Sequence, residues 1–599
     1  MEKRMKERKD MDPQYMWDLS TLYKNDEEWN NALPELNEMI KKLPEYQGKL
    51  NNAKTIRDFF DFDTHLGRKL SDFYCYASLR NCEDTRDSEA QAMEAKAYQV
   101  YTAYATAISF AEPEILSLDE DVLEAIVHSE DLKPYAFNMQ KLLDQKPHVL
   151  SAKEEALLAA FTETLGAPSK ISESLQDADM TFESVTDSNG EVHELNQSNY
   201  ILLQMSEDRT LRLNAFKSFY KGFKQHINTF AATYNGCIKE AVAEAQVRHY
   251  ESSRAMSMAY EHVPGVVYDS LVDTVRKFMP EMYRYVRLRK QILGLDELHY
   301  YDVYTPLIAG SSKSYTYEEA QQMVLDAVKP LGEDYVNRVK QAYKDRWIDV
   351  YPNNGKRGGA FSSGTYDSNP YILTSFTGTL DSVSTIAHEM GHSQHTWLSN
   401  HTQTPQNADY TLFVAEVAST VNENLLVEQL LQKTTEPKER LALLNHYLEG
   451  FKGTVYRQTM FAEFERDAHA MAERGEAITA ASMNTLYKNL IKDYFGEDLV
   501  IDDEVQYEWA RIPHFYRPFY VYKYATSYCA AVALSEAILN NEEGAVKRYL
   551  EFLSMGGSAY PLDELKHAGV DFSTPEPVSR ALTKFSQILD DVEETLKKL

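Results

Sequence analysis

The chain has 599 residues, too many for one compact core, which predicts three or four units or one large helical body closed around a cleft. Hydrophobic residues at 43% and aromatic residues at 12% exclude a disordered chain, and 24 glycines with 20 prolines are few enough to favour long helices. The formal net charge of −30 disfavours nucleic acid and an anionic membrane as partners, because both bind basic surfaces.

The cysteines and the N-terminus predict a cytoplasmic protein. Cys75, Cys82, Cys237 and Cys529 match no metal or redox spacing, so we expect reduced, partly buried thiols. The charged N-terminus runs into no apolar stretch of signal-peptide length. No window approaches about 18 uninterrupted apolar residues, so no transmembrane span is predicted.

Helical periodicity dominates residues 1–200, which we interpret as an N-terminal helical region. One apolar stripe recurs at helical spacing and predicts core packing; its members are Leu66, Leu70, Phe73 and Ala77. Near 180–195 the pattern changes, because β-prone segments flank Asn189-Gly190, a turn typical of a β-hairpin.

Residues 201–599 are predicted to form a second helical region, which carries the catalytic site. Its least helical stretch, roughly 346–380, contains several turn residues and a β-prone run. We therefore expect a short sheet near 350–377 and no other sheet in this region. A long helix should follow at once, capped by Thr379 or Asp381. The fold class is therefore mainly α.

A His-Glu-x-x-His motif lies on the helix expected after the sheet. His388 and His392 are four residues apart, so both imidazoles lie on one helix face and can converge on one ion. Zn²⁺ accepts nitrogen ligands at about 2.0–2.1 Å, and a catalytic zinc keeps one position open for water. Glu389 points to the side of this pair, where it can deprotonate that water as general base and later act as acid. The motif predicts one zinc per chain; the alternative is two surface histidines at helical spacing.

A tetrahedral catalytic zinc needs a third protein ligand, which a downstream residue can supply. The metzincin continuation is absent, because it requires glycine and histidine where the chain has Gln394 and Leu398. Glu416 lies in an apolar helical segment, where an unpaired carboxylate is costly to bury and a bound metal removes that cost. We therefore predict Glu416 as the third ligand. Glu423, two turns later on the same face, is predicted to orient a ligand histidine, with the role of third ligand as an alternative. An exposed charge is the alternative for both glutamates. His395 is predicted to be either an outer partner of the site or an ordinary polar helix residue.

These motifs resemble the thimet-oligopeptidase family of zinc metallopeptidases, in the segments 388–392 and 413–419. Further segments are similar to the bacterial oligoendopeptidase F branch: 16–20, 356–361, 369–372 and 518–522. The resemblance spans nearly the whole chain. It implies a helical ellipsoid split by a deep substrate channel, with zinc at its floor and cleavage restricted to short peptides.

Peptide hydrolysis passes through a tetrahedral oxyanion, which needs hydrogen-bond donors besides a metal. Tyrosines that recur every fourth residue predict a phenol stripe on a helix, with aromatic packing as the alternative. The stripe consists of Tyr516, Tyr520, Tyr524 and Tyr528. In the family, a histidine and tyrosines of this region stabilise the oxyanion. The resemblance implies His514 and Tyr520 for this role, with Tyr524 third and Tyr522 as a further candidate.

Two glycines before the predicted sheet indicate a surface for the substrate. Glycine lacks the side chain that blocks a close backbone approach, so an extended peptide could pair with an exposed strand edge here. The predicted substrate-binding residues are Gly358, Gly359, Ala360, Phe361 and Tyr371. The alternative is a tight structural loop.

The sequence thus predicts a zinc-dependent endopeptidase that hydrolyses internal bonds of short peptides, as a monomer or small homo-oligomer. One alternative is a zinc exopeptidase, carboxypeptidase-like or dipeptidase-like, in which Arg357 or Arg517 binds a peptide end. A second alternative is a non-enzymatic helical scaffold that binds partners through its acidic surface.

Overall fold

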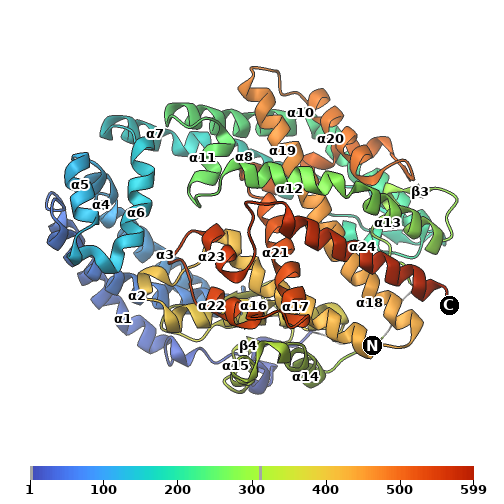
Figure 1. Ribbon diagram of the computed structural model, residues 1–599, viewed down its shortest axis with the longest axis horizontal. Helices are drawn as coiled ribbons and strands as arrows, with labels where there is room; N and C mark the ends of the chain where they lie inside the picture. Colours follow the sequence, from blue (N-terminus) through green and yellow to red (C-terminus); the bar gives the residue numbers. More distant parts are fainter. Residues whose placement is uncertain (1–4, 309–312) are drawn as a thin grey trace. The chain divides into compact units, whose positions relative to one another are not determined.

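The computed structural model describes residues 5–308 and 313–599, and helices dominate both ranges (Figure 1). The predicted mainly α fold is confirmed. No helix in the described ranges is both long and apolar enough to cross a membrane.

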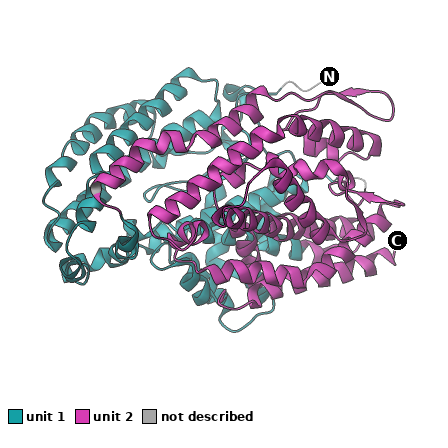
Figure 2. Ribbon diagram, turned by 90° about the horizontal axis from the view of Figure 1, so that it is seen from above, with its two compact units in different colours: residues 1–149, 313–429, 534–570 teal, residues 150–312, 430–533, 571–599 magenta. Residues whose placement is uncertain are grey.

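The chain divides into two compact units, each built from three separate stretches of sequence (Figure 2). Unit 1 contains residues 1–149, 313–429 and 534–570, and unit 2 contains residues 150–312, 430–533 and 571–599. The predicted sequence boundary near residue 200 stays a prediction.

The helices of unit 1 come from all three of its stretches, and two of them, α16 and α17, carry the predicted metal ligands. They are α1 Asp26–Ile40, α2 Ala53–Glu83, α3 Ser88–Ile108, α4 Ala111–Leu116, α5 Glu120–Val127, α6 Ala136–Gln145, α14 Tyr317–Ala327, α15 Glu333–Lys344, α16 Leu380–Thr402, α17 Leu412–Lys433 (to Gln429), α22 Ala545–Leu553 and α23 Pro561–Ala568.

The first helices of unit 1 form a hydrophobic cluster together with residues of the small sheet. The predicted apolar stripe of α2 is buried in this cluster, which confirms the packing interpretation. Trp29 of α1 stacks on Phe73 of α2 with ring centroids 4.2 Å apart. The indole N–H of Trp29 also donates to the Phe73 carbonyl oxygen at 2.7 Å.

A small sheet of unit 1 lies against α16. Its strands run in the order β4–β6–β5, with β4 Ile348–Asp349 parallel and β5 Phe361–Ser363 antiparallel to β6 Tyr371–Leu373. The hydroxyls of Ser362 on β5 and Ser393 on α16 are 2.8 Å apart. The predicted sheet beside the motif helix is therefore confirmed. The strand order makes β5 an edge strand.

The start of α16 follows from a local cap. The Thr379 hydroxyl accepts the backbone N–H of Ser382 at 3.2 Å, which satisfies one of the free donors of the first turn. Of the two predicted caps, Thr379 is the one used.

Unit 2 is also helical and contains the longest helix, α10. Its helices are α7 Ala152–Leu165, α8 Ala167–Ser174, α9 Tyr200–Gln204, α10 Arg209–Val247, α11 Ser253–Ala259, α12 Gly265–Lys277, α13 Met279–Ile292, α18 Pro437–Gly450, α19 Arg457–Glu473, α20 Ala480–Phe495, α21 Tyr522–Leu539 (to residue 533) and α24 Glu576–Leu596.

Two short strand pairs also belong to unit 2. β1 Val185–Thr186 pairs antiparallel with β2 Val192–His193, which confirms the predicted hairpin. β3 Leu298–His299 pairs parallel with β7 Leu499–Val500. The expectation of a single sheet after residue 200 is therefore wrong, because two-residue strands 200 positions apart leave no periodic signal.

Candidate metal site

The two motif helices of unit 1 approach each other closely at Gly391. A Cβ atom at Gly391 would lie 2.5 Å from the Ala418 carbonyl oxygen and 2.6 Å from the Ser419 Cα. Only glycine therefore lets α16 and α17 pack at this distance. This contact lies between the two histidines of α16 and beside Glu416 of α17, so it sets the spacing of the site.

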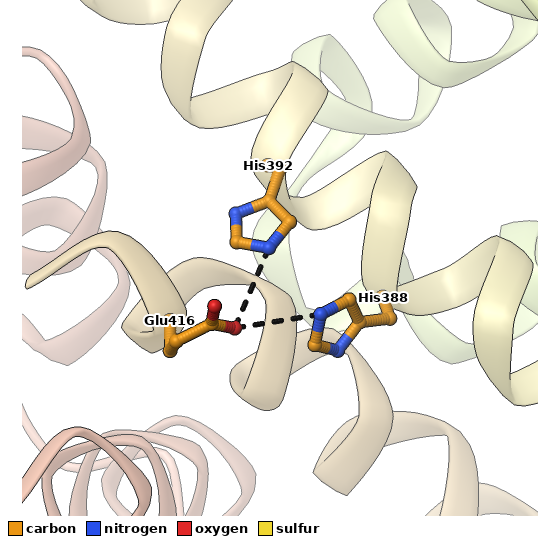
Figure 3. Close-up of side chains that lie close together, drawn as sticks. All are labelled: His388, His392 and Glu416. Atoms are coloured by element: carbon orange, nitrogen blue, oxygen red, sulfur yellow. Dashed lines mark ion pairs between the residues drawn. The ribbon is translucent and has the colours of Figure 1, made fainter. Parts of the chain in front are cut away.

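His388, His392 and Glu416 point toward one another from α16 and α17 (Figure 3). The Nε2 atoms of both histidines lie 3.4 Å from the same oxygen, Oε2 of Glu416. The imidazole centroids are 4.9 Å apart, and the ligand atoms of all three residues lie within 4.8 Å of one another. The structure thus brings the three predicted ligands together.

The donor set fits zinc in both chemistry and spacing. Two imidazole nitrogens with one carboxylate oxygen is a common protein donor set for catalytic zinc. Atoms bound at about 2.0–2.1 Å to a tetrahedral ion lie roughly 3.4 Å apart, which is the separation of both nitrogens from the Glu416 oxygen. All three side chains remain partly exposed, at 17–37%, as access for a substrate requires.

A second layer of contacts orients His388 and Glu416. Glu423 Oε1 lies 3.4 Å from Nδ1 of His388, the nitrogen that faces away from Glu416. The Ser384 hydroxyl donates to the same Glu423 oxygen at 3.5 Å. The Ser419 hydroxyl donates to Glu416 Oε2 at 3.0 Å. A carboxylate on the outer nitrogen holds the imidazole in one tautomer and one orientation.

Two contributors to this arrangement were not predicted as site residues. Ser419 follows Glu416 by one helical turn, a spacing that could have identified it. Asn422, fully buried on α17, donates its side-chain amide to the Ala387 carbonyl oxygen of α16 at 3.1 Å. Because that bond links two separate helices, no local pattern in the sequence predicts it.

Burial and charge shift the pKa values of the site in opposite directions. Burial would lower the pKa of His388, but the carboxylates of Glu416 and Glu423 outweigh it and raise that pKa well above its usual value. Burial would raise the pKa of Glu416, but the two imidazoles outweigh it and hold that pKa well below its usual range. Burial raises the pKa of Glu389, whose side chain is 6% exposed.

His395 takes no part in the ligand cluster. It is buried and stacks on Tyr410 with ring centroids 3.6 Å apart. Burial lowers its pKa to about 3, so the imidazole is neutral. It is a packing residue of α16.

A second group of possible ligand atoms lies at the tip of the hairpin in unit 2. Asp187, Glu191 and His193 also come within 4.8 Å of one another. Asp187 accepts the backbone N–H groups of Asn189 and Glu191, so its carboxylate stabilises the turn, and Glu191 is exposed. This geometry is explained by the hairpin alone.

Unit 2 brings His514, Tyr520 and Tyr524 together. The rings of His514 and Tyr520 are almost parallel with centroids 6.2 Å apart. The Tyr524 hydroxyl lies 3.5 Å from Nε2 of His514. Burial and the nearby Arg517 lower the pKa of His514, which favours a neutral imidazole. The Arg517 guanidinium lies over the Tyr520 ring, 4.3 Å from its centroid.

The predicted helix through this tyrosine stripe is wrong. The 3₁₀ helix η13 ends at Tyr516 and α21 begins at Tyr522, so the chain between them is not helical. Phe519 has a φ of +55°, in the left-handed region that breaks a helix. Tyr528 is buried and packs on Phe451. Tyr522 is also fully buried, so neither phenol is available to a substrate.

The predicted substrate segment is only partly available. Gly358, Gly359 and Ala360 are exposed and Phe361 is half-buried at the start of the edge strand β5. Tyr371 is fully buried, and its hydroxyl lies 2.5 Å from that of Thr21. A side chain buried in the core cannot contact a peptide, so the substrate role predicted for Tyr371 is withdrawn.

Comparison with known proteins gives full-length matches. The profile of peptidase family M3 matches residues 202–584, and that of oligopeptidase F matches residues 114–182. The chain is 44% identical to oligopeptidase PepF of Bacillus subtilis (strain 168) over 585 residues, 97% of this chain and 87% of that protein.

Solved structures agree with the sequence comparison. A crystal structure of oligoendopeptidase-F from Enterococcus faecium is 36% identical, with a TM-score of 0.75 over 96% of this chain and 100% of that one. The crystal structure of a Chlamydophila abortus protein is 34% identical, with a TM-score of 0.92 over 99% of this chain and 100% of that one.

Proposed function

The chain belongs to peptidase family M3, and on that premise we propose that it is a zinc-dependent endopeptidase that hydrolyses internal bonds of short peptides. The observation that carries this proposal is the shared oxygen of Glu416, which lies 3.4 Å from Nε2 of both His388 and His392. The names of the relatives, oligopeptidase and oligoendopeptidase, support oligopeptides as substrates.

His388, His392 and Glu416 would hold one zinc ion per chain. When bound there, zinc supplies Lewis acidity, which polarises a scissile carbonyl and lowers the pKa of a water molecule. Glu423 would fix the ring of His388 through the outer nitrogen.

Glu389 would act as general base and then as general acid. It takes a proton from the attacking water and later passes that proton to the nitrogen of the leaving amine. Burial raises its pKa toward the working pH, which suits a group that must both accept and release a proton.

His514 and Tyr520 would stabilise the oxyanion, with Tyr524 as a third donor. The contacts among the three within unit 2 support a shared role, and the lowered pKa of His514 keeps its imidazole neutral. Removing one oxyanion donor typically lowers kcat by about 10²–10³-fold.

The exposed segment Gly358–Phe361 would bind the peptide backbone by adding it to the edge of β5. Recognition of this kind depends on hydrogen bonds to the peptide backbone and not on its side chains, which suits a broad substrate range. The deep channel implied by the family resemblance would restrict access to short peptides, and it stays a prediction. We propose a cytoplasmic location, which the four buried, unpaired cysteines support.

The proposal is tested by zinc analysis together with peptide cleavage. The wild-type protein should hold one zinc and Glu416→Ala should lose it. Glu389→Gln should keep zinc and lose about 10²–10⁴-fold in kcat. Full activity of Glu389→Gln with zinc bound would contradict the mechanism.

A nonapeptide blocked at both ends distinguishes the two peptidase alternatives. An endopeptidase cuts it internally, whereas an exopeptidase that requires a free end leaves it intact; mass spectrometry of the products reads the difference. Cleavage that is abolished by a chelator and restored by zinc excludes the non-enzymatic scaffold.

A further inference from the structure

The turn that precedes Tyr520 is strained. Phe519 has a φ of +55°, a strained conformation that a bulky residue adopts only where its surroundings enforce it. The Phe519 side chain is 2% exposed and lies 4.7 Å from the His469 ring, centroid to centroid. Such strain concentrates at functional sites.

A buried carboxyl group holds this turn. Glu465 of α19 is 0% exposed, and its Oε1 accepts the backbone N–H of Phe519 at 2.7 Å. Among the described residues Glu465 makes no ion pair, and its Oε2 has no hydrogen-bond partner. Burial raises its pKa well above the usual value, which favours the neutral form of the carboxyl group. Burying an isolated acid costs free energy, and within the described ranges the side chain of Glu465 is hydrogen-bonded to the strained amide of Phe519.

A second contact holds the residue before Phe519. The Ser257 hydroxyl of α11 donates to the Pro518 carbonyl oxygen at 2.8 Å. Elements far apart in sequence thus fix both polar atoms of one peptide group, the one that joins Pro518 to Phe519. The residue that follows is Tyr520, whose ring meets that of Tyr524 at 5.3 Å between centroids.

We propose that Glu465 is a positioning residue for Tyr520: its carboxyl oxygen fixes the amide of Phe519 and so holds the turn that places Tyr520 beside His514 and Tyr524. This inference rests on the proposed function, in which Tyr520 donates to the oxyanion. Glu465 itself touches no substrate.

Two substitutions of Glu465 isolate the contribution of its acceptor oxygen. Glu465→Gln keeps an acceptor oxygen and is neutral, so kcat should stay within a few-fold of wild type. Glu465→Leu removes the acceptor at similar volume, and kcat should fall about 10²-fold, the cost of misplacing an oxyanion donor. KM and zinc content should change little in both variants.

A double-mutant cycle tests whether Glu465 acts through Tyr520. In a Tyr520→Phe background the phenol is already lost, so Glu465→Leu should cost far less kcat than in wild type. Equal costs in both backgrounds would overturn the inference. If Glu465→Leu does not fold, Ser257→Ala takes its place in the cycle. It removes the other contact to the same turn, so we expect a smaller loss of kcat that again depends on the Tyr520 hydroxyl.

A matched control excludes general destabilisation. Glu463→Leu also removes a buried carboxyl group from α19, one that pairs with Arg276. It should lower the melting temperature while keeping kcat. A kcat loss equal to that of Glu465→Leu would overturn the inference. A wild-type protein that holds zinc but cleaves no peptide would instead refute the proposed function, and the inference with it.

Discussion

Gly391 of α16 faces the Ala418 carbonyl oxygen of α17 so closely that a Cβ atom at residue 391 would lie 2.5 Å from that oxygen. Backbone atoms cannot move aside as a flexible side chain can. The glycine is therefore what lets the Glu416 carboxylate reach both imidazoles of α16. The geometry of the metal site therefore depends on glycine at position 391 as well as on its three ligands.

We predict that Gly391→Ala separates the two helices and weakens zinc binding. Overpacking a tight contact typically costs about 1–3 kcal/mol, and a lengthened distance to Glu416 should lower zinc affinity as well. Melting temperature and zinc retention on dialysis against a chelator measure the two effects. The control is Gly67→Ala in α2, where a Cβ atom would meet open space. Unchanged zinc retention in Gly391→Ala would contradict the prediction.

The local part of this site could be predicted from the sequence. The His-Glu-x-x-His spacing places two imidazoles on one helix face, and Glu416 stands out as an acid in an apolar helix. The close contact through Gly391 joins helices that sequence patterns treat separately. It could not be predicted, although the glycine was visible within the motif.

The tyrosine region shows why residue periodicity fails to predict secondary structure where tertiary contacts determine the backbone conformation. A spacing of four predicted a helix from Tyr516 to Tyr528, although Pro518 within this range disfavours a helix. Phe519 lies in the left-handed region, and its N–H donates to the buried Glu465, a contact that the local pattern does not contain. Partners more than 50 residues apart therefore override the local pattern.

We predict that Glu423→Gln lowers zinc affinity by about 10–100-fold without removing any ligand. The amide keeps the size of the side chain but loses the negative charge beside Nδ1 of His388. Competition with a fluorescent zinc chelator measures the affinity. Asp381→Asn removes an exposed carboxylate from the first turn of the same helix α16 and should leave the affinity unchanged. Equal affinities for Glu423→Gln and wild type would exclude the orienting role.

A buried acid on α23 should make the stability of unit 1 depend on pH. Glu564 is 1% exposed, and burial raises its pKa from 4.5 to about 8. Because the folded pKa lies above the unfolded one, its stabilising contribution is complete below about pH 4.5 and is lost as pH rises toward 8. The full span is at most about 4–5 kcal/mol, at 1.36 kcal/mol per pKa unit.

We therefore predict that Glu564→Gln, which cannot ionise, gains stability over wild type as pH rises. The difference in melting temperature should grow from pH 5 to pH 8 and then level off. Other titrating groups cancel in this difference. Glu543→Gln, an exposed glutamate of the same unit, should show no such trend. A difference for Glu564→Gln that is flat across this range would show that the carboxyl group is ionised throughout.

Gly358 offers the sharpest test of the substrate edge. Gly359 has a φ of +89°, and this left-handed backbone conformation accounts for a glycine at position 359. At Gly358 the backbone is not left-handed, and a Cβ atom would meet no protein atom within 4 Å. The fold therefore has no need of a glycine at 358, whereas a peptide lying against the chain there would.

We predict that Gly358→Val raises KM by about 3–10-fold, the cost of one or two weakened backbone hydrogen bonds, with kcat nearly unchanged. Stability should stay within about 0.5 kcal/mol, because the side chain points into open space. A peptide methylated at the amide nitrogens that pair with β5 should already bind weakly to wild type, so the valine should add little to its KM. An unchanged KM for the unmethylated peptide, with the protein fully folded, would favour the structural-loop alternative for this segment.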